Sequence, residues 1–184
     1  MQPPIDAVLK IVNENNVRPE QVKKIKVGVL KAGAPLIAEP IESKYNPQSI
    51  VDAQFSMPFG AATALLYGKA GLEEFQPSVI HSRPVREMMR KVECIVDPEL
   101  DRTFPRQWRA TAEILTEDEK RYSTTVEYPK GDPENPLSLE DMIERFHDLT
   151  GRIMKKQQRL KIVEEVQRLD GIKDIRKWSS LLLR

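Results

Sequence analysis

Ser56 and Pro58 stand at the start of a predicted apolar helix, in the run FSMPFGAATALL at 55–66. Serine is a common N-cap residue, and proline is tolerated in the first helical turn because the N–H group that it lacks would have no partner there. The N–H groups of Phe59 and Gly60 would then point out of the helix end with partial positive charge. Such a helix end can bind a carboxylate or a phosphate group.

Neighbouring residues would strengthen an anion site at this helix end. Gly60 would let a ligand approach the backbone closely. Gln54 and Ser56 supply side-chain donors, and Lys44 in the preceding segment supplies a positive charge. The same features also describe an ordinary helix start that binds only water. The spacing alone leaves both interpretations open, with Lys44, Gln54, Ser56, Phe59 and Gly60 as the candidate binding residues.

Other reactive side chains are few. His81 is interpreted as a polar loop residue and His147 as a solvated helical residue. Cys94 lies within an apolar strand pattern, which favours a buried and unreactive thiol. The chain has no HExxH or CxxC motif, and Gly60 and Gly68 form neither a P-loop nor a dinucleotide fingerprint. We therefore expect no metal site and no nucleotide cofactor, and no catalytic residue is assigned.

The composition predicts a soluble globular protein. The chain has 184 residues, and its 29 Lys and Arg nearly balance its 28 Asp and Glu, which leaves a net charge of +1. This balance gives no global electrostatic reason to expect nucleic acid or an anionic membrane as a partner. Neither a signal sequence nor a membrane-spanning apolar stretch is present, and the single cysteine excludes a disulfide within the chain. We expect a cytoplasmic protein.

Helical spacing of apolar residues predicts three helices in the first half of the chain, at 3–12, 57–67 and 82–92. Each has proline in its first turn, and Ser56 and Ser82 stand at the N-cap positions of the second and third helices. The predicted apolar faces consist of Ile5, Val8, Leu9 and Val12 in the first helix and of Val85, Met88 and Met89 in the third.

Alternating side chains predict four strands, at 22–30, 92–96, 109–116 and 121–128. The last two strands are joined by only four residues, so we expect an antiparallel hairpin. The proline-rich stretch 31–49 has no period and is interpreted as a long surface loop. Together these elements predict an α+β domain in which helices cover one face of an antiparallel sheet.

The character of the chain changes at the proline-rich turns of 129–136. Ser138 and Asp141 then form a capping-box pattern, and only helical patterns follow. These helices alone would make a thin core, so they must pack on another surface. We expect an α+β domain at 1–135 and a helical segment at 136–184. The apolar stripes comprise Leu139, Met142, Ile143, Phe146 and Leu149, then Leu160, Val163, Val166 and Leu169 before Gly171, and finally Ile172, Ile175 and Trp178.

Several ordered segments resemble the C-terminal part of the MmgE/PrpD family. YNPQSIVDAQFSMPFGAATALLYG at 45–68 is the most distinctive. IHSRPVREMMRKVECIVDPEL at 80–100 and YPKGDPENPLSLEDMIERF at 128–146 follow in the family's order, and PPIDAVLKI at 3–11 resembles the start of its smaller domain. The resemblance therefore extends over nearly the whole chain.

This resemblance implies an enzyme. Family members include 2-methylcitrate dehydratase, cis-aconitate decarboxylase and iminodisuccinate epimerase, which act on small di- or tricarboxylates without a metal or an organic cofactor. They are homodimers with a large all-helical domain and a smaller lid domain of chorismate-mutase-like topology, and their last helices return to the large domain. The resemblance thus implies the lid and C-terminal helices of a lyase, of the hydro-lyase type of 2-methylcitrate dehydratase.

The same resemblance implies that acid and base residues lie outside this sequence. Family members are more than twice as long, and a histidine is expected where Met1 and Gln2 stand, so the chain would be a fragment or one half of a split enzyme. By itself it should lack turnover and would need the family's N-terminal all-helical portion. Lys44, Gln54, Ser56, Phe59 and Gly60 would contact substrate carboxylates from the lid. The family position at Phe59 is often tyrosine, whose hydroxyl can reach substrate, and phenylalanine has no such donor.

Other functions remain open at this point. The helices at 136–184 would also suit a non-catalytic module that pairs two copies of the chain, since both interpretations need a partner for the apolar faces. An isomerase or a decarboxylase of the same family is a further alternative. Chorismate mutase chemistry is disfavoured, because no set of arginines converges on one predicted helix face.

Overall fold

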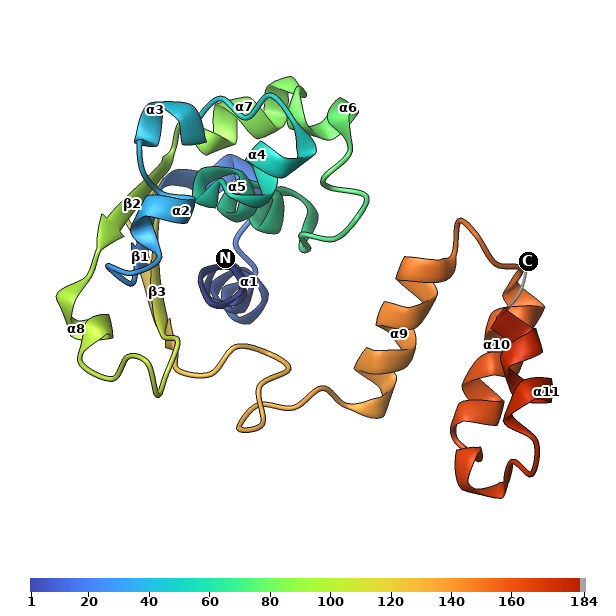
Figure 1. The fold of residues 1–184 in the computed structure, drawn as a ribbon. Coiled ribbons are helices and arrows are strands. Elements are labelled where there is room, and N and C mark those ends of the chain that lie inside the picture. The colour runs from blue at the N-terminus through green and yellow to red at the C-terminus, as the bar shows by residue number, and fades with distance from the viewer. Residues whose placement is uncertain (183–184) are drawn as a thin grey trace. The chain divides into compact units, whose positions relative to one another are not determined.

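A four-stranded sheet with helices on one face dominates the first of two units in the computed structural model, which describes residues 1–182 (Figure 1). The first unit is Met1–Pro136, and the second begins at Leu137. The predicted α+β class is confirmed, with further helices in the second unit. Within the described residues, every helix is too short or too polar to cross a membrane.

The sheet has the strand order β2-β1-β3-β4. The predicted hairpin of β3 and β4 is confirmed, and β1 also pairs antiparallel with β3. One pair departs from the expected antiparallel sheet, because β1 and β2 run parallel. A parallel pair needs a long crossover, and the chain between these two strands supplies it with six helices. The strands are β1 Val22–Val29, β2 Val92–Val96, β3 Ala110–Thr116 and β4 Arg121–Val126.

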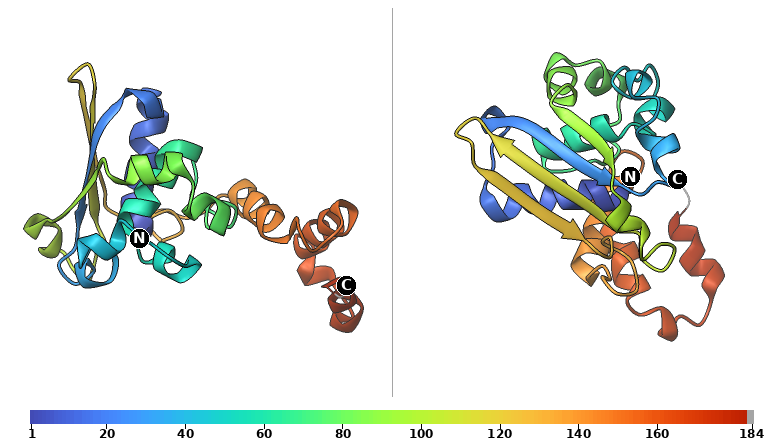
Figure 2. Two further views of the ribbon diagram at one scale, coloured as in Figure 1. Left: turned by 90° about the horizontal axis from the view of Figure 1, so that it is seen from above. Right: turned by 90° about the vertical axis from the view of Figure 1, so that its left-hand side faces the viewer.

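Three predicted helices are confirmed, and in Figure 2 these three lie on the same side of the sheet of the first unit. Helix α1 (Gln2–Asn15) packs on β3 and β4, while α5 (Met57–Tyr67) packs on α1 and on α7 (Arg83–Met89). Val85, Met88 and Met89 are buried as predicted. Ser82 precedes α7, but its predicted capping bond is absent and its buried Oγ has no partner among the described residues.

The stretch 31–49 is not the irregular loop that was predicted. It contains two one-turn helices, α2 (Ala34–Ile37) and α3 (Ile41–Lys44). Pro35 lies in the first turn of α2 and Pro40 is the N-cap residue of α3, so these prolines begin helices instead of preventing them. The remaining short elements of this unit are η1 (Pro19–Gln21), α4 (Ile50–Gln54), α6 (Pro77–Ile80) and α8 (Pro98–Asp101).

The second unit is helical throughout its described part. Its first helix begins with the predicted capping box, in which the N–H of Asp141 donates to Ser138 Oγ and the N–H of Ser138 donates to the Asp141 carboxylate. Leu169 was placed in the second helix but lies in a separate turn, and Ile172 precedes the third. The elements are α9 (Leu139–Thr150), α10 (Lys156–Val166), η2 (Leu169–Gly171), α11 (Ile175–Ser179) and η3 (Ser180–Leu182).

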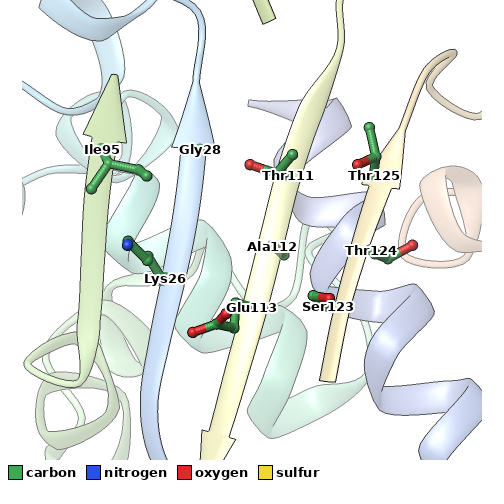
Figure 3. Close-up of a pocket in the computed structure, with 9 residues that line it drawn as sticks. All are labelled: Lys26, Gly28, Ile95, Thr111, Ala112, Glu113, Ser123, Thr124 and Thr125. Carbon is green, nitrogen blue, oxygen red and sulfur yellow. The ribbon is translucent and has the colours of Figure 1, made fainter. Parts of the chain in front are cut away.

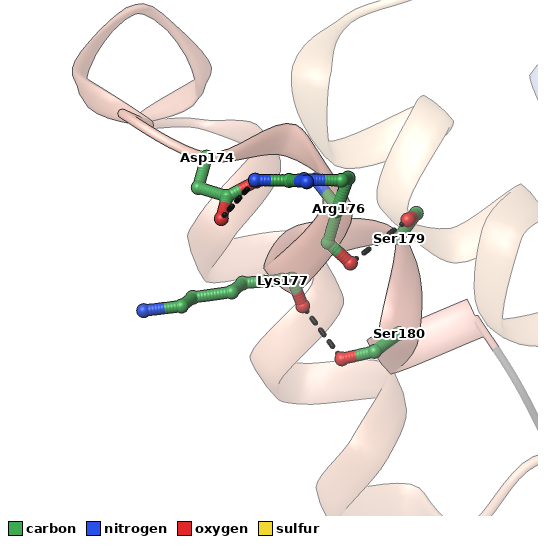
Figure 4. A network of polar contacts seen from close by, with 5 residues as sticks. All are labelled: Asp174, Arg176, Lys177, Ser179 and Ser180. Carbon is green, nitrogen blue, oxygen red and sulfur yellow. Dashed lines mark hydrogen bonds and ion pairs between the residues drawn. The ribbon is translucent and has the colours of Figure 1, made fainter.

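Local side-chain bonds hold the short helix α11 (Figure 4). The Asp174 carboxylate accepts from the backbone N–H and the Nε–H of Arg176, at 3.1 Å each. Ser179 Oγ donates to the carbonyl of Arg176, and Ser180 Oγ donates to the carbonyl of Lys177. These bonds replace part of the packing that a five-residue helix lacks.

The second unit has almost no core of its own. Ile162 is the one apolar side chain that is buried in its described part, at 4% exposure. The predicted apolar stripes are instead largely open to solvent. The exposed members include Leu139, Met142, Leu149, Leu160, Val166, Leu169 and Ile175.

Candidate functional site

Helix α5 begins and ends where the sequence predicted. Ser56 is its N-cap residue, Pro58 lies in the first turn, and Gly68 ends the helix in the left-handed conformation at φ 67°. Every residue from Met57 to Leu65 is buried, because this helix lies at the centre of the first unit.

The two N–H groups that were predicted to face an anion are already occupied. The N–H of Phe59 donates to Ser56 Oγ at 3.2 Å, and the N–H of Gly60 donates to the carbonyl of Ser56 at 3.0 Å. Pro58 has no N–H group. The structure therefore corrects the predicted anion site: its N–H donors serve the helix itself.

Gly60 lies where two helices approach each other closely. A Cβ atom at this position would lie 3.0 Å from Ile5 Cδ1 and 3.3 Å from Met1 Cε. The absent side chain thus lets α1 approach α5 closely, which is a different role from the predicted approach of a ligand. Phe59 is also a core residue, since it is fully buried and its ring meets Phe75 edge-on at 5.0 Å between centroids.

Lys44 and Ser56 are joined directly. Ser56 Oγ donates to the carbonyl of Lys44 at 2.6 Å, and Lys44 Nζ donates to the carbonyl of Leu36 at 2.6 Å. Because Ser56 also caps α5, one hydroxyl fixes both the helix start and the backbone at Lys44. Ser56 is completely buried, so it can position Lys44 but cannot itself reach a ligand in this conformation.

Gln54 is the predicted site residue with the most accessible position. It ends α4 and is exposed, and Phe55 beside it is 46% exposed. Val51, on the same short helix, is 61% exposed. The accessible part of the predicted site is therefore Lys44 and Gln54, next to apolar side chains that the sequence interpretation did not include.

Arg86 is a cationic neighbour of this segment that the sequence analysis missed. Its guanidinium donates to Asn46 Oδ1 at 2.6 Å and to the carbonyl of Pro47 at 3.4 Å. It also lies 3.0 Å from His81 Nδ1, which places the predicted loop histidine beside a cation. Arg86 and Asn46 are 40 positions apart in the sequence, so no local sequence pattern predicts this contact. These hydrogen bonds hold the segment that follows Lys44 against α7.

Asp6 is a second titratable residue that the sequence analysis did not single out. Burial raises the pKa of its carboxyl group, while the hydrogen bond that it accepts from the N–H of Lys130 acts in the opposite direction. A half-buried carboxyl group with a raised pKa can serve as a general acid or base. The hydrogen bond from the N–H of Lys130 to the Asp6 carboxylate also joins α1 to the segment that follows the β3–β4 hairpin. Asp6 therefore has a structural role.

Cys94 lies within a strand, as predicted, but the expected full burial is not reached. It is half-buried in β2, and burial together with the nearby Glu93 raises the pKa of its thiol to about 12. Tyr45 lies close by, donates its hydroxyl to the carbonyl of Val92, and has its pKa raised mainly by burial. A thiol with such a pKa is almost entirely protonated at neutral pH and is a poor nucleophile.

The open face of the sheet carries a shallow hollow of about 520 Å³, in which alternate side chains of neighbouring strands face outward (Figure 3). Lys26 is opposite Glu93 on one neighbouring strand and opposite Glu113 on the other. Lys24 pairs with Glu93, and Arg121 with Glu113, each at 3.0 Å. This mixed and mutually paired charge is typical of a solvated sheet face. Among residues 1–182, no group of three or more His, Cys, Asp or Glu side chains can hold a metal ion.

A comparison with protein-family models shows to which family the chain belongs. A family model described as the MmgE/PrpD C-terminal domain matches residues 1–169. The chain belongs to the MmgE/PrpD family. The match includes all of the first unit and continues in the second unit to Leu169. A search of curated proteins found no match.

The start of α5 at Ser56 lies within the part of the chain that the family model matches. The MmgE/PrpD match contains all five candidate binding residues, Lys44, Gln54, Ser56, Phe59 and Gly60. It therefore confirms the family that the ordered motifs indicated, and it identifies a related family of enzymes without naming a reaction for this chain.

Proposed function

We propose that this chain is the C-terminal part of a MmgE/PrpD-type lyase that acts on a small di- or tricarboxylate in the cytoplasm. The hydro-lyase chemistry of 2-methylcitrate dehydratase is the form that we favour. The observation that carries this proposal is the family match over residues 1–169. The ordered motifs at 45–68, 80–100 and 128–146 support it.

In this proposal residues 1–135 act as a lid over the substrate. Lys44 and Gln54 would bind substrate carboxylates, because both reach the surface of the segment around the α5 start. Lys44 Nζ now donates to a neutral carbonyl, and a carboxylate would be a stronger acceptor for the same ammonium group. Closing the lid would also exclude water from the reacting atoms.

Ser56, Phe59 and Gly60 would support the lid contacts without touching the substrate. Ser56 fixes the backbone of Lys44, and Phe59 and Gly60 fix α5 within the core. This division follows from burial, since all three residues are inaccessible in the structure. Phe59 also lacks the hydroxyl group that a tyrosine would offer, so its contribution is apolar packing.

The acid and base groups would come from the family's N-terminal all-helical portion. A general base would remove the proton α to a carboxylate, and a general acid would assist the leaving group. Positioned cations and N–H groups would stabilise the developing negative charge. The exposed apolar faces of α9 and α10 would pack on that helical portion, in a homodimeric enzyme.

The test is to combine this chain with the all-helical portion of a family enzyme and to measure turnover of 2-methylcitrate. We expect turnover by the pair and none by this chain alone. Lys44→Ala should raise KM by about tenfold through the loss of a charge-assisted contact. Lys10→Ala, at an exposed position on α1, is the matched control and should leave KM unchanged.

The same assay separates the alternatives. Release of carbon dioxide from cis-aconitate would indicate a decarboxylase, and interconversion of iminodisuccinate stereoisomers would indicate an epimerase. A pair that associates but converts none of these compounds would refute the lyase proposal and favour the dimerising module. If turnover occurs but both Lys44→Ala and Ser56→Ala retain the original kcat and KM, the lid contacts are assigned wrongly.

A further inference from the structure

The outer edge of β2 exposes unpaired backbone groups. The N–H of Ile25 donates to the carbonyl of Lys91, and the N–H of Asp97 donates to the carbonyl of Val29. In a parallel pair, the backbone groups of alternate residues form hydrogen bonds to the neighbouring strand. The backbone N–H and C=O groups of residues 91, 93, 95 and 97 therefore point toward β1. The backbone groups of Val92, Cys94 and Val96 therefore point away from the sheet, at its edge.

Only the first of these outward positions has a partner within residues 1–182. Tyr45 donates its hydroxyl to the carbonyl of Val92, which confirms the outward direction of that carbonyl. Beyond this contact, the backbone N–H and C=O groups of Cys94 and Val96 lie along a groove of about 420 Å³. Two donors and two acceptors thus remain in the arrangement that a further strand requires.

The walls of the groove define the strand that would fit it. Ala38, Ile41 and Tyr45 form the wall that faces β2, on the segment around α3 that lies beside β2 in Figure 1. The charged residues that line the groove are Glu39 and Glu93, and no lysine or arginine lines it in the described part of the chain. Glu93 pairs with Lys24, whereas Glu39 is exposed and forms no ion pair with residues 1–182.

We propose that this groove binds an extended, positively charged peptide segment of another protein, which adds to the sheet as a fifth strand beside β2. The backbone groups of Cys94 and Val96 hold the segment, small or apolar side chains fill the space against Ala38 and Ile41, and a lysine or arginine meets Glu39. This proposal is independent of the proposed lyase function.

A defined peptide tests the proposal on the full chain. The probe is Ac-Thr-Val-Lys-Val-Lys-Val-Thr-amide, and its control carries Glu in place of both Lys. Binding is followed by amide NMR spectra and by hydrogen exchange of isotope-labelled protein. We expect the lysine peptide to slow exchange at the amides of Cys94 and Val96, and the glutamate peptide to have a much weaker effect.

Two variants examine the backbone and the charge separately. Val96→Pro removes one outward N–H group but leaves the inward N–H groups of the ladder with β1 intact, so the edge strand should persist. It should weaken binding by about three- to tenfold through one lost hydrogen bond. Glu39→Lys should weaken binding by about two- to fivefold, and the matched control Glu14→Lys, on an exposed site of α1, should have no effect.

Three outcomes would overturn the proposal. One is the absence of protection at Cys94 and Val96 at millimolar lysine peptide. Another is binding that Val96→Pro and Glu39→Lys both leave unchanged, since the peptide would then occupy a different surface. The third is protection that grows with protein concentration in the absence of peptide, which would assign the edge to a second copy of this chain.

Discussion

Helices α1 and α9 have similar lengths, but their surroundings differ completely. Helix α9 has the stronger local signals, with a full capping box and a clear apolar stripe, yet none of its residues is buried. Helix α1 has no side-chain cap, but it buries Pro4, Ala7, Val8 and Ile11 against the sheet and α5. An amphipathic pattern therefore predicts which face of a helix is apolar, and the rest of the fold decides whether that face is covered.

The same difference separates the two units. The first unit buries one continuous core, from α1 through the sheet to α7. The second unit keeps its helices by capping and local bonds and leaves its apolar stripes exposed. Stability measured on this chain should therefore come mainly from residues 1–136, and substitutions that are equivalent by sequence should have unequal effects in the two units.

Removing a large apolar side chain should give the largest contrast. Phe59→Ala should lower the free energy of unfolding of the first unit by about 3–5 kcal/mol, because the ring is fully buried against Phe75. Leu160→Ala should cost less than about 1 kcal/mol, because that side chain is 50% exposed. Urea denaturation followed by circular dichroism measures both. Equal losses would show that the second unit has a core comparable to that of the first.

Thiol chemistry provides the next contrast. Cys94 should react with a thiol reagent at pH 8 about a hundredfold more slowly in the folded than in the unfolded chain, because its raised pKa keeps it protonated and it is half-buried. A cysteine placed in the second unit by Leu160→Cys, with Cys94→Ala to remove the native thiol, should react at nearly the unfolded rate. Rapid reaction of the native Cys94 would contradict the packing of β2 beside Tyr45.

The raised pKa of Cys94 also predicts a pH dependence. The folded pKa of about 12 exceeds the ordinary value of 9.0, so folding favours the protonated thiol. Its stabilising effect is complete below pH 9 and is lost as pH rises from 9 toward 12, because the unfolded chain then binds fewer protons than the folded chain. The difference in unfolding free energy between the native chain and Cys94→Ala should shrink or reverse over that range.

The two serine N-caps give a smaller, matched comparison. Ser56→Ala should cost about 2 kcal/mol, because it leaves the buried N–H of Phe59 and the carbonyl of Lys44 without their partner. Ser138→Ala should cost at most about 1 kcal/mol and should act locally, since water can replace an exposed cap. Hydrogen exchange at the first turns of α5 and α9 distinguishes the global from the local effect.

Glycine substitution should give the smallest effect. Gly60→Ala should destabilise the first unit by about 1 kcal/mol, because its Cβ would press on Ile5 and Met1. Gly171→Ala should stay within about 0.5 kcal/mol of the native chain, because no atom lies within 4 Å of the added Cβ. Thermal unfolding of the two variants provides the measurement, and a stabilised Gly60→Ala would show that α1 can shift away from α5.

The sequence alone was sufficient for features that depend on neighbouring residues. The limits of α5 follow from Ser56, Pro58 and Gly68, and the capping box of α9 follows from Ser138 and Asp141. The hairpin of β3 and β4 follows from alternating side chains and a short connection. The family affiliation likewise follows from ordered local motifs. Each of these signals acts within one or a few turns of chain, so no knowledge of the whole fold is needed.

Only the tertiary structure decided the role of each residue at the candidate site. The sequence offered the N–H groups of Phe59 and Gly60 as free donors, but both are bonded to Ser56. It presented Gly60 as open to a ligand, whereas Ile5 fills that space, and it gave no sign of the contact between Arg86 and Asn46. These outcomes depend on residues tens of positions apart that meet only when the chain has folded, and so does the parallel pairing of β1 with β2. Local patterns fix which groups a segment offers, and long-range packing fixes what those groups contact.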